Sequence, residues 1–176
     1  MLPVANPLTI LTSVDSTNNY AMGMVRDGLA KHGEAWFSYE QTHGKGRRGK
    51  MWKAEKGKNI ILTIVVSTRF LTVYQQFYLS VAVSLACLEF YKKYAGDETK
   101  IKWPNDIFWN DRKAGGILIE NVVKGNDWQW AIIGIGININ QTEFSVDGVF
   151  VPVSLKQITG REYDVIALAN ELYEMV

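Results

Sequence analysis

Hydrophobic side chains recur along this chain with two different periods, and each period predicts one kind of element. Residues 59–67 form a β-branched run with polar residues on both sides, which predicts a buried strand. Between residues 73 and 94 the apolar positions recur at helical spacing, and Gly96 stands where such a helix should end. The same reasoning predicts strands at residues 8–14, 34–40, 100–103, 116–123 and 128–140, and helices from residue 18 to about residue 30 and over residues 164–176.

The order of these elements predicts the fold class. Strands and helices follow one another without strict βαβ alternation, which favours an α+β fold with a mixed β-sheet flanked by helices over a doubly wound sheet. Residues 141–160 are expected to be rich in loops. A chain of 176 residues is expected to form one domain, residues 1–176.

Composition argues against several classes of protein. The formal net charge is +1, so no general basic field favours nucleic acid, and any cationic function must be local. A single cysteine, Cys87, excludes an intramolecular disulfide, and with only two histidines it argues against a structural zinc site. Neither a secretory signal nor an apolar stretch long enough to cross a bilayer is visible, so we expect a cytoplasmic protein that has no membrane partner.

A short basic loop at residues 41–52 is the most informative local feature. It has glycines at positions 44, 46 and 49, and cationic residues at positions 45, 47, 48 and 50. Glycine lets the backbone approach a ligand closely, and interleaved Lys and Arg neutralise phosphate or carboxylate. The spacing is not that of a Walker motif, and no βαβ unit surrounds the loop as a dinucleotide fingerprint would require.

Two further segments carry polar residues of a related kind. Residues 102–106 read Lys-Trp-Pro-Asn-Asp, and residues 112–118 read Arg-Lys-Ala-Gly-Gly-Ile-Leu. Activation of a carboxylic acid with ATP needs such groups, because the acid and the triphosphate are both anions and pyrophosphate must leave. We therefore interpret the three segments as parts of one site that adenylates an acid.

These segments, together with residues 15–18 (Asp-Ser-Thr-Asn) and 134–138 (Gly-Ile-Gly-Ile-Asn), resemble the catalytic domain of biotin protein ligases in identity and order. The resemblance runs from about residue 9 to residue 174 and implies a fold related to class II aminoacyl-tRNA synthetases. It also implies that residues 1–176 are a single catalytic domain with a truncated C-terminal end, because such ligases commonly add a small β-barrel after the last helix. No N-terminal DNA-binding segment is expected.

The family pattern implies a role for each matching residue. Contacts to biotin are implied for Ser16, Thr17, Asn18, Gln41, Gly44, Lys45, Gly46, Arg47, Lys113, Gly116, Ile117 and Gly136. Contacts to ATP or the adenylate are implied for Lys45, Arg47, Trp52, Asn105, Asp106, Lys113 and Asn138. Catalysis would fall to Lys113, Arg47 and Asp106, with Lys113 as the cation that touches both the biotin carboxyl and the α-phosphate.

The activity implied is ATP-dependent ligation of biotin to one lysine of a biotin carboxyl carrier domain, through biotinyl-5′-AMP. Mg²⁺ is expected to enter with the triphosphate, since no cluster of side chains suggests a metal site of its own. Lys45 stands where the family usually has arginine, and it keeps the charge without the planar fork, so weaker retention of the adenylate is expected. The sequence is compatible with a monomer or a homodimer.

The sequence leaves several alternatives open. A lipoate or octanoate protein ligase would share the fold and the adenylate, but the R-x-S-G-G-G loop usual in those enzymes is absent. A non-catalytic biotin or nucleotide sensor, or a repressor, would not need Lys113 and Asp106. Residues 15–18 could serve only as a helix cap. The tryptophans at positions 36, 109, 128 and 130 are interpreted as sheet packing rather than as a stacking platform.

Overall fold

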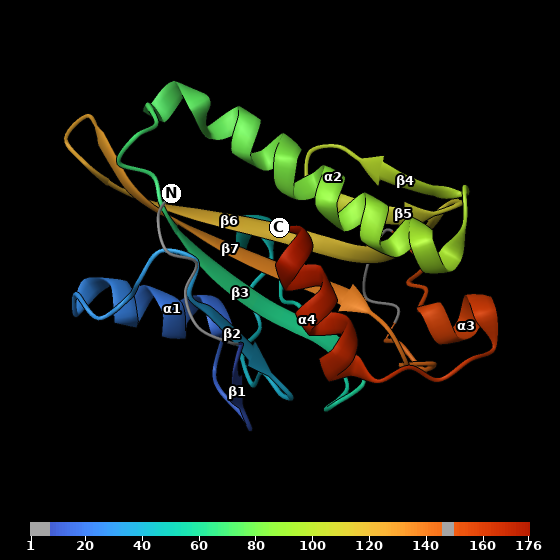
Figure 1. The fold of residues 1–176 in the computed structure, drawn as a ribbon. Coiled ribbons are helices and arrows are strands. Elements are labelled where there is room, and N and C mark those ends of the chain that lie inside the picture. Colours follow the sequence, from blue (N-terminus) through green and yellow to red (C-terminus); the bar gives the residue numbers. More distant parts are fainter. Residues whose placement is uncertain (1–7, 146–149) are drawn as a thin grey trace.

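The computed structural model describes residues 8–145 and 150–176, and a seven-stranded mixed sheet forms its centre (Figure 1). The strands lie in the order β1-β2-β3-β7-β6-β5-β4, and only the β1–β2 pair is parallel. The predicted α+β class, with a mixed sheet flanked by helices, is confirmed. The strands are β1 (Thr9–Leu11), β2 (Ala35–Ser38), β3 (Asn59–Ser67), β4 (Thr99–Lys102), β5 (Asp106–Trp109), β6 (Arg112–Lys124) and β7 (Asp127–Asn138).

Helices cover both faces of this sheet. Helix α2 (Gln76–Ala95) contacts β4, β5 and α4 (Val165–Met175), and α4 also contacts β3. Helix α1 (Thr17–Arg26) contacts β2, β3 and β7, and Figure 1 shows it on the other side of the sheet from α2. The remaining helical segments are α3 (Leu155–Thr159) and the short 3-10 turns η1 (Arg47–Gly49) and η2 (Val73–Gln75).

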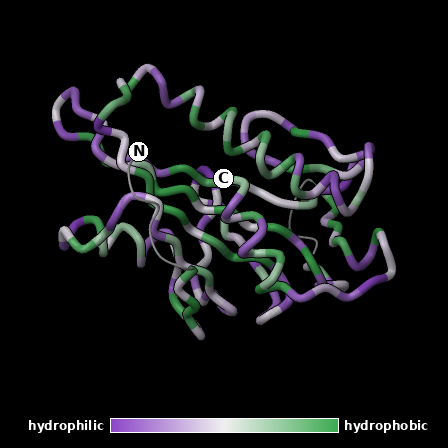
Figure 2. Tube along the Cα trace, viewed as in Figure 1, coloured by the Kyte–Doolittle hydropathy of each residue, from purple (hydrophilic) through white to green (hydrophobic). Residues whose placement is uncertain are grey.

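Side chains of the central strands point alternately to the two faces of the sheet. One face is packed with hydrophobic side chains, and the other carries a cavity. On β7, Ile133, Ile135 and Ile137 belong to the large core beneath α2 and α4. Because successive side chains of a strand point to opposite faces, Gly134 and Gly136 lie on the α1 side and leave room there. Figure 2 shows the hydrophobic residues concentrated along these central strands.

The elements with long, regular patterns form where they are predicted. Strand β3 covers the predicted residues 59–67, α2 ends with Gly96 as its C-cap, and α4 follows Asp164, whose side chain caps it. The strongest local signals are therefore confirmed, and none of the helices in the described part of the chain is both long and apolar enough to span a bilayer.

Shorter elements differ from the prediction. Helix α1 ends at Arg26, before the predicted residue 30, because Gly28 takes a left-handed φ of 70° that no helix continues. Strand β1 is shorter than predicted, and β6 begins at Arg112 rather than at residue 116. Strand β5 was not predicted, and the five-residue helix α3 lies inside residues 141–160, a segment that is predicted only to be rich in loops. Residues 146–149 of that predicted loop lie outside the described residues.

Candidate functional site

A cavity on the α1 side of the sheet brings together segments that are far apart in the sequence. It holds about 480 Å³ of space, including its open mouth. The residues that line it are Ser16, Thr17, Asn18, Gln41, Lys45, Gly46, Arg47, Trp52, Ile61, Leu62, Asn105, Asp106, Lys113, Gly116, Ile117, Leu118, Gly134, Ile135 and Gly136.

All the site residues named from the sequence line this cavity except Gly44 and Asn138. The lining also contains Leu118 and Gly134, which are not among the site residues named from the sequence. Both stand two positions along their strands from an assigned glycine, so the period of two could have found them. By contrast, Ile61 comes from β3, and only the pairing of β3 with β7 brings it to the cavity.

The start of α1 and the loop that follows β2 form a neutral, polar end of the cavity, made by Ser16, Thr17, Asn18 and Gln41. The backbone N–H and the hydroxyl of Thr17 lie 2.8 and 3.0 Å from Oε1 of Gln41. Ser16 occupies the N-cap position, but its side chain makes no capping hydrogen bond. The interpretation of residues 15–18 as a side-chain helix cap is therefore wrong, because Gln41 supplies the acceptor instead.

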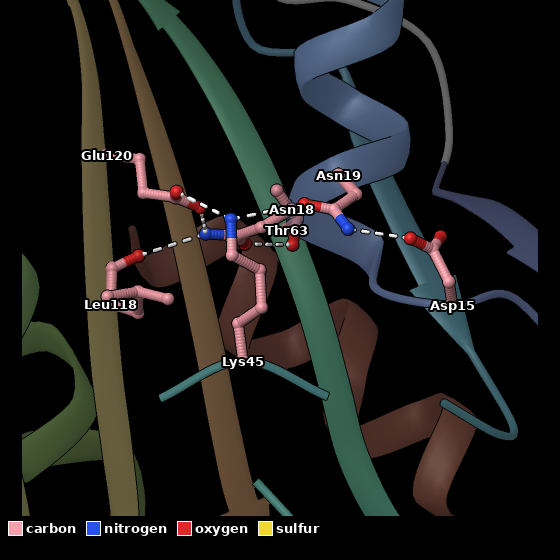
Figure 3. A network of polar contacts seen from close by, with 7 residues as sticks. All are labelled: Asp15, Asn18, Asn19, Lys45, Thr63, Leu118 and Glu120. Atoms are coloured by element: carbon pink, nitrogen blue, oxygen red, sulfur yellow. Dashed lines mark hydrogen bonds and ion pairs between the residues drawn. The ribbon is translucent and has the colours of Figure 1, made fainter. Parts of the chain in front are cut away.

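The Asn18 side chain contacts three other residues at this neutral end (Figure 3). Its Nδ2 donates to Oε2 of Glu120 at 2.9 Å and lies 3.4 Å from the Leu118 carbonyl oxygen. Its Oδ1 accepts from the Thr63 hydroxyl at 2.7 Å. Gly134 faces this amide, and a Cβ at position 134 would collide with it. Glycine at position 134 therefore makes room for the Asn18 side chain, while the strand continues beneath it.

A cationic end of the cavity is formed by Arg47, Asn105, Asp106 and Lys113. Nζ of Lys113 lies 2.8 Å from Oδ1 of Asp106, and the two side chains are 29% and 18% exposed. Arg47 donates from Nη1 to Oδ1 of Asn105 at 3.0 Å. The structure thus brings two of the three cationic site residues named from the sequence, Arg47 and Lys113, to one end of one cavity, each held by a polar neighbour.

A β-bulge places Lys113 on this side of the sheet. Strand β5 pairs Ile107 with Gly115 but Phe108 with Lys113, so Ala114 is an extra residue in β6. Lys113 is three positions from Gly116 and would face the other side in a regular strand, because side chains alternate. The extra residue restores the phase and lets Lys113 share the cavity with Gly116.

The basic loop forms a small hairpin over the cavity. Gly46 donates its N–H to the Lys50 carbonyl at 2.7 Å, and Trp52 donates its N–H to the Gly44 carbonyl at 2.9 Å. Gly49 turns the chain with a φ of 73°. A Cβ at Gly44 would collide with the Trp52 carbonyl oxygen, so Gly44 serves the closure of the hairpin rather than the cavity wall.

Asn138 lies beneath the cavity instead of lining it. Its side chain is buried, and Nδ2 is 3.3 Å from the Lys113 carbonyl oxygen and 3.2 Å from that of Val153. These contacts hold the backbone that carries Lys113. Direct contact of Asn138 with an adenylate, which the resemblance implies, would require Nδ2 to leave both carbonyls if this nitrogen made the contact.

Among the described residues that line the cavity, Asp106 is the only acidic one. The Asn19 amide, 2.6 Å from Oδ2 of Asp15, lowers the pKa of that carboxyl, so Asp15 is anionic over the ordinary pH range. Across residues 8–145 and 150–176, no three His, Cys, Asp or Glu side chains are grouped to hold a metal ion.

Comparison with protein families gives one match over most of the chain. The model described as the "Biotin/lipoate A/B protein ligase family" matches residues 10–138. Among curated relatives, the bifunctional ligase/repressor BirA of Escherichia coli is 34% identical over 136 residues, which is 75% of this chain and 40% of that protein. A biotin–[acetyl-CoA-carboxylase] ligase of Paracoccus denitrificans is 34% identical over 163 residues, which is 88% of this chain and 65% of that protein.

A solved structure shares the fold. The biotin protein ligase of Aquifex aeolicus, solved in complex with biotin and ATP, superposes with a TM-score of 0.80 at 24% identity, covering 96% of this chain and 67% of that one. The present chain therefore spans less than two thirds of the length of the two curated relatives and about two thirds of this solved chain.

Proposed function

Because the chain belongs to the biotin/lipoate A/B protein ligase family, we propose that it activates biotin with ATP and ligates it to a lysine of a biotin carboxyl carrier domain. The observation that carries this proposal is the polarity of the cavity. Amides, hydroxyls and the mutually paired charges of Lys45 and Glu120 lie at one end, and the cations Arg47 and Lys113 lie at the other. Biotin has the same polarity, since a neutral ureido ring and a carboxylate stand at its two ends. The name of the P. denitrificans relative supports biotin over lipoate.

The two ends are spaced to suit such a ligand. Gly116 lies beside the side chains of Lys113 and Asp106, whereas Leu118 and Gly134 lie beside Asn18. Two residues along a strand span about 7 Å, a length that the valeryl chain of biotin covers. The ring would then rest among Ser16, Thr17, Asn18 and Gln41, and the carboxylate would reach the cations.

In the first step, an oxygen of the biotin carboxylate attacks the α-phosphorus of ATP. The bond from that phosphorus to the pyrophosphate oxygen breaks, and biotinyl-5′-AMP and pyrophosphate form. Lys113 and Arg47 would offset the negative charge that gathers as the two anions meet. Before the substrates bind, the ion pair with Asp106 keeps the Lys113 side chain in place. When they bind, Lys113 would give up part of this contact and would contact the biotin carboxylate and the α-phosphate instead.

In the second step, the ε-amine of the acceptor lysine attacks the acyl carbon of biotinyl-5′-AMP. The bond between the acyl carbon and the phosphate oxygen breaks, AMP leaves, and the amine loses a proton as the amide forms. Asp106 is the carboxylate among the residues of the cationic end, and it would orient the amine and receive that proton. The hairpin of the basic loop would keep water away from the mixed anhydride between the two steps.

Mg²⁺ is part of the proposal as a companion of ATP. The Asp106 carboxylate and the Asn105 amide oxygen are hard donors at the cationic end, the kind that Mg²⁺ accepts beside substrate phosphates. When bound, the ion would supply further charge compensation at the triphosphate. The use of ATP and of carrier domains suits a cytoplasmic location.

Exchange of labelled pyrophosphate into ATP tests the proposal. We expect exchange that depends on biotin and is absent without it, with lipoate run in parallel as the competing acid. Transfer of labelled biotin to an isolated carrier domain then tests the second step, with a carrier whose acceptor lysine is replaced as the control. Exchange with lipoate but not with biotin would overturn the choice of substrate.

A further inference from the structure

The ammonium of Lys45 is held at the neutral end of the cavity, away from the cations. Its Nζ lies 2.7 Å from Oε1 of Glu120 and 3.1 Å from Oδ1 of Asn19. Glu120 stands four residues along β6 from Gly116, a distance of about 13 Å. Figure 3 shows the lysine side chain running from the basic loop to Glu120. An ammonium held there is not placed to contact a phosphate beside Lys113.

Lys45 also separates two hollows. Residues of the basic loop, together with Leu118 and Glu120, line a second hollow on the outer side. Lys45, Gly46 and Leu118 line both this hollow and the inner cavity. The Lys45 side chain bonds to Asn19 of α1 and to Glu120 of β6. It therefore forms the boundary between the neutral end and the outer hollow.

Glu120 uses both of its carboxylate oxygens in this arrangement. Oε1 accepts from Lys45, and Oε2 accepts from Nδ2 of Asn18 at 2.9 Å. With Nδ2 held, Oδ1 of Asn18 meets the Thr63 hydroxyl. One carboxylate thus fixes the direction of the Asn18 amide and the place of the Lys45 ammonium at the same time.

We propose that Glu120 is a positioning residue that holds Lys45 as a strap across the neutral end, so that the ring of bound biotin is enclosed. This inference rests on the function proposed above. The Lys45 and Glu120 side chains are 40% and 26% exposed, and a partly exposed ion pair is weak enough to open when a ligand enters. Glu120 acts on the ligand through Lys45 and Asn18 and does not take part in the bond changes.

Replacing Glu120 by glutamine separates this role from general packing. Glutamine keeps the size of the side chain but offers one acceptor oxygen to two donors, Lys45 and Asn18, and has no charge to attract the ammonium. We expect E120Q to release biotin about tenfold faster and to raise KM for biotin about tenfold, with KM for ATP close to the wild-type value. K45M should do the same, and the double variant should lose little more than either single one.

Stopped-flow measurement of biotin release and the two KM values from pyrophosphate exchange provide the readouts. Lys45→Arg keeps a cation within reach of Glu120, so it should release biotin no faster than the wild type does. Glu98→Gln removes a surface carboxylate 3.9 Å from Lys100 and should change neither constant. Thermal unfolding checks that each variant is folded.

Wild-type release and KM values in E120Q would overturn the inference, and so would a K45M variant that raises KM for ATP alone. A wild-type chain that binds no biotin would instead overturn the proposed function, and this inference with it.

Discussion

The indole of Trp52 rests on the backbone of Gly136, where a Cβ would approach its Cε2 to 2.5 Å. Gly116 pairs with Gly136 on the neighbouring strand, and a Cβ there would lie 3.4 Å from the same indole. Two facing glycines therefore make a flat floor for the ring. Nζ of Lys113 lies 5.9 Å from the centre of the Trp52 ring. Trp52, the last residue of the basic loop, therefore lies beside the cationic end of the cavity.

Gly136→Ala should push the indole out of place and misplace the basic loop. Overpacking of this kind costs about 1–3 kcal/mol, so we expect kcat/KM for pyrophosphate exchange to fall about tenfold or more. The change should also appear in the tryptophan fluorescence of the unliganded protein.

Gly23→Ala is the matched control for that substitution. Gly23 lies inside α1, with no atom within 4 Å of an added Cβ. Alanine there should leave exchange unchanged and should raise the free energy of unfolding by about 0.5–1 kcal/mol. Wild-type exchange in Gly136→Ala would contradict the idea that Trp52 needs this floor.

The sequence predicted those parts of the fold that are specified by local patterns. Strand β3 and helices α2 and α4 each have a long apolar period and a clear end signal, such as Gly96. Strand β5 has only four residues after Asn105, too few for a period, and it forms because β4 and β6 pair with it. Helix α3 is likewise only five residues long, although its Ser154 forms a capping box with Gln157 that could have been found.

The candidate site depended on features that no local pattern contains. Lys113 was assigned by resemblance, whereas the strand period alone would place it on the face opposite Gly116, because the bulge at Ala114 is invisible in the sequence. Glu120 was missed because its partner Asn18 lies 102 positions away. Pairings of this kind follow from the sheet order, which brings distant segments together.

Lys113→Met should remove the cation that meets both substrate anions. Loss of one charge-stabilising group typically lowers kcat by about 10²–10³, and we expect a fall of that size in pyrophosphate exchange. The control is Lys124→Met, at the far end of the same strand and outside the cavity, which should keep wild-type exchange. Exchange close to that of the wild type in Lys113→Met would show that another group carries the charge.

Asn138→Ala distinguishes a positioning role from contact with the adenylate. The substitution removes the donor that faces the Lys113 and Val153 carbonyls, so we expect the free energy of unfolding to fall by about 1–3 kcal/mol. KM for ATP should stay near its wild-type value at temperatures where the variant is folded. Asn170→Ala, at an exposed position of α4, should change neither quantity much. A raised KM for ATP with unchanged stability would favour direct contact with the adenylate.

Cys87 should report on the integrity of the core beneath α2. The thiol is fully buried, and burial raises its pKa to about 12, so it should resist a disulfide reagent at mildly alkaline pH until the chain is unfolded. An unfolded thiol ionises near pH ~8.5, so above that pH the unfolded chain loses a proton that the folded chain keeps until about pH 12. The free energy of unfolding should therefore decrease as pH rises through this window, and Cys87→Ala should lack that part of the slope. Denaturant titrations at several alkaline pH values measure it, and rapid labelling of the native protein would contradict the buried position.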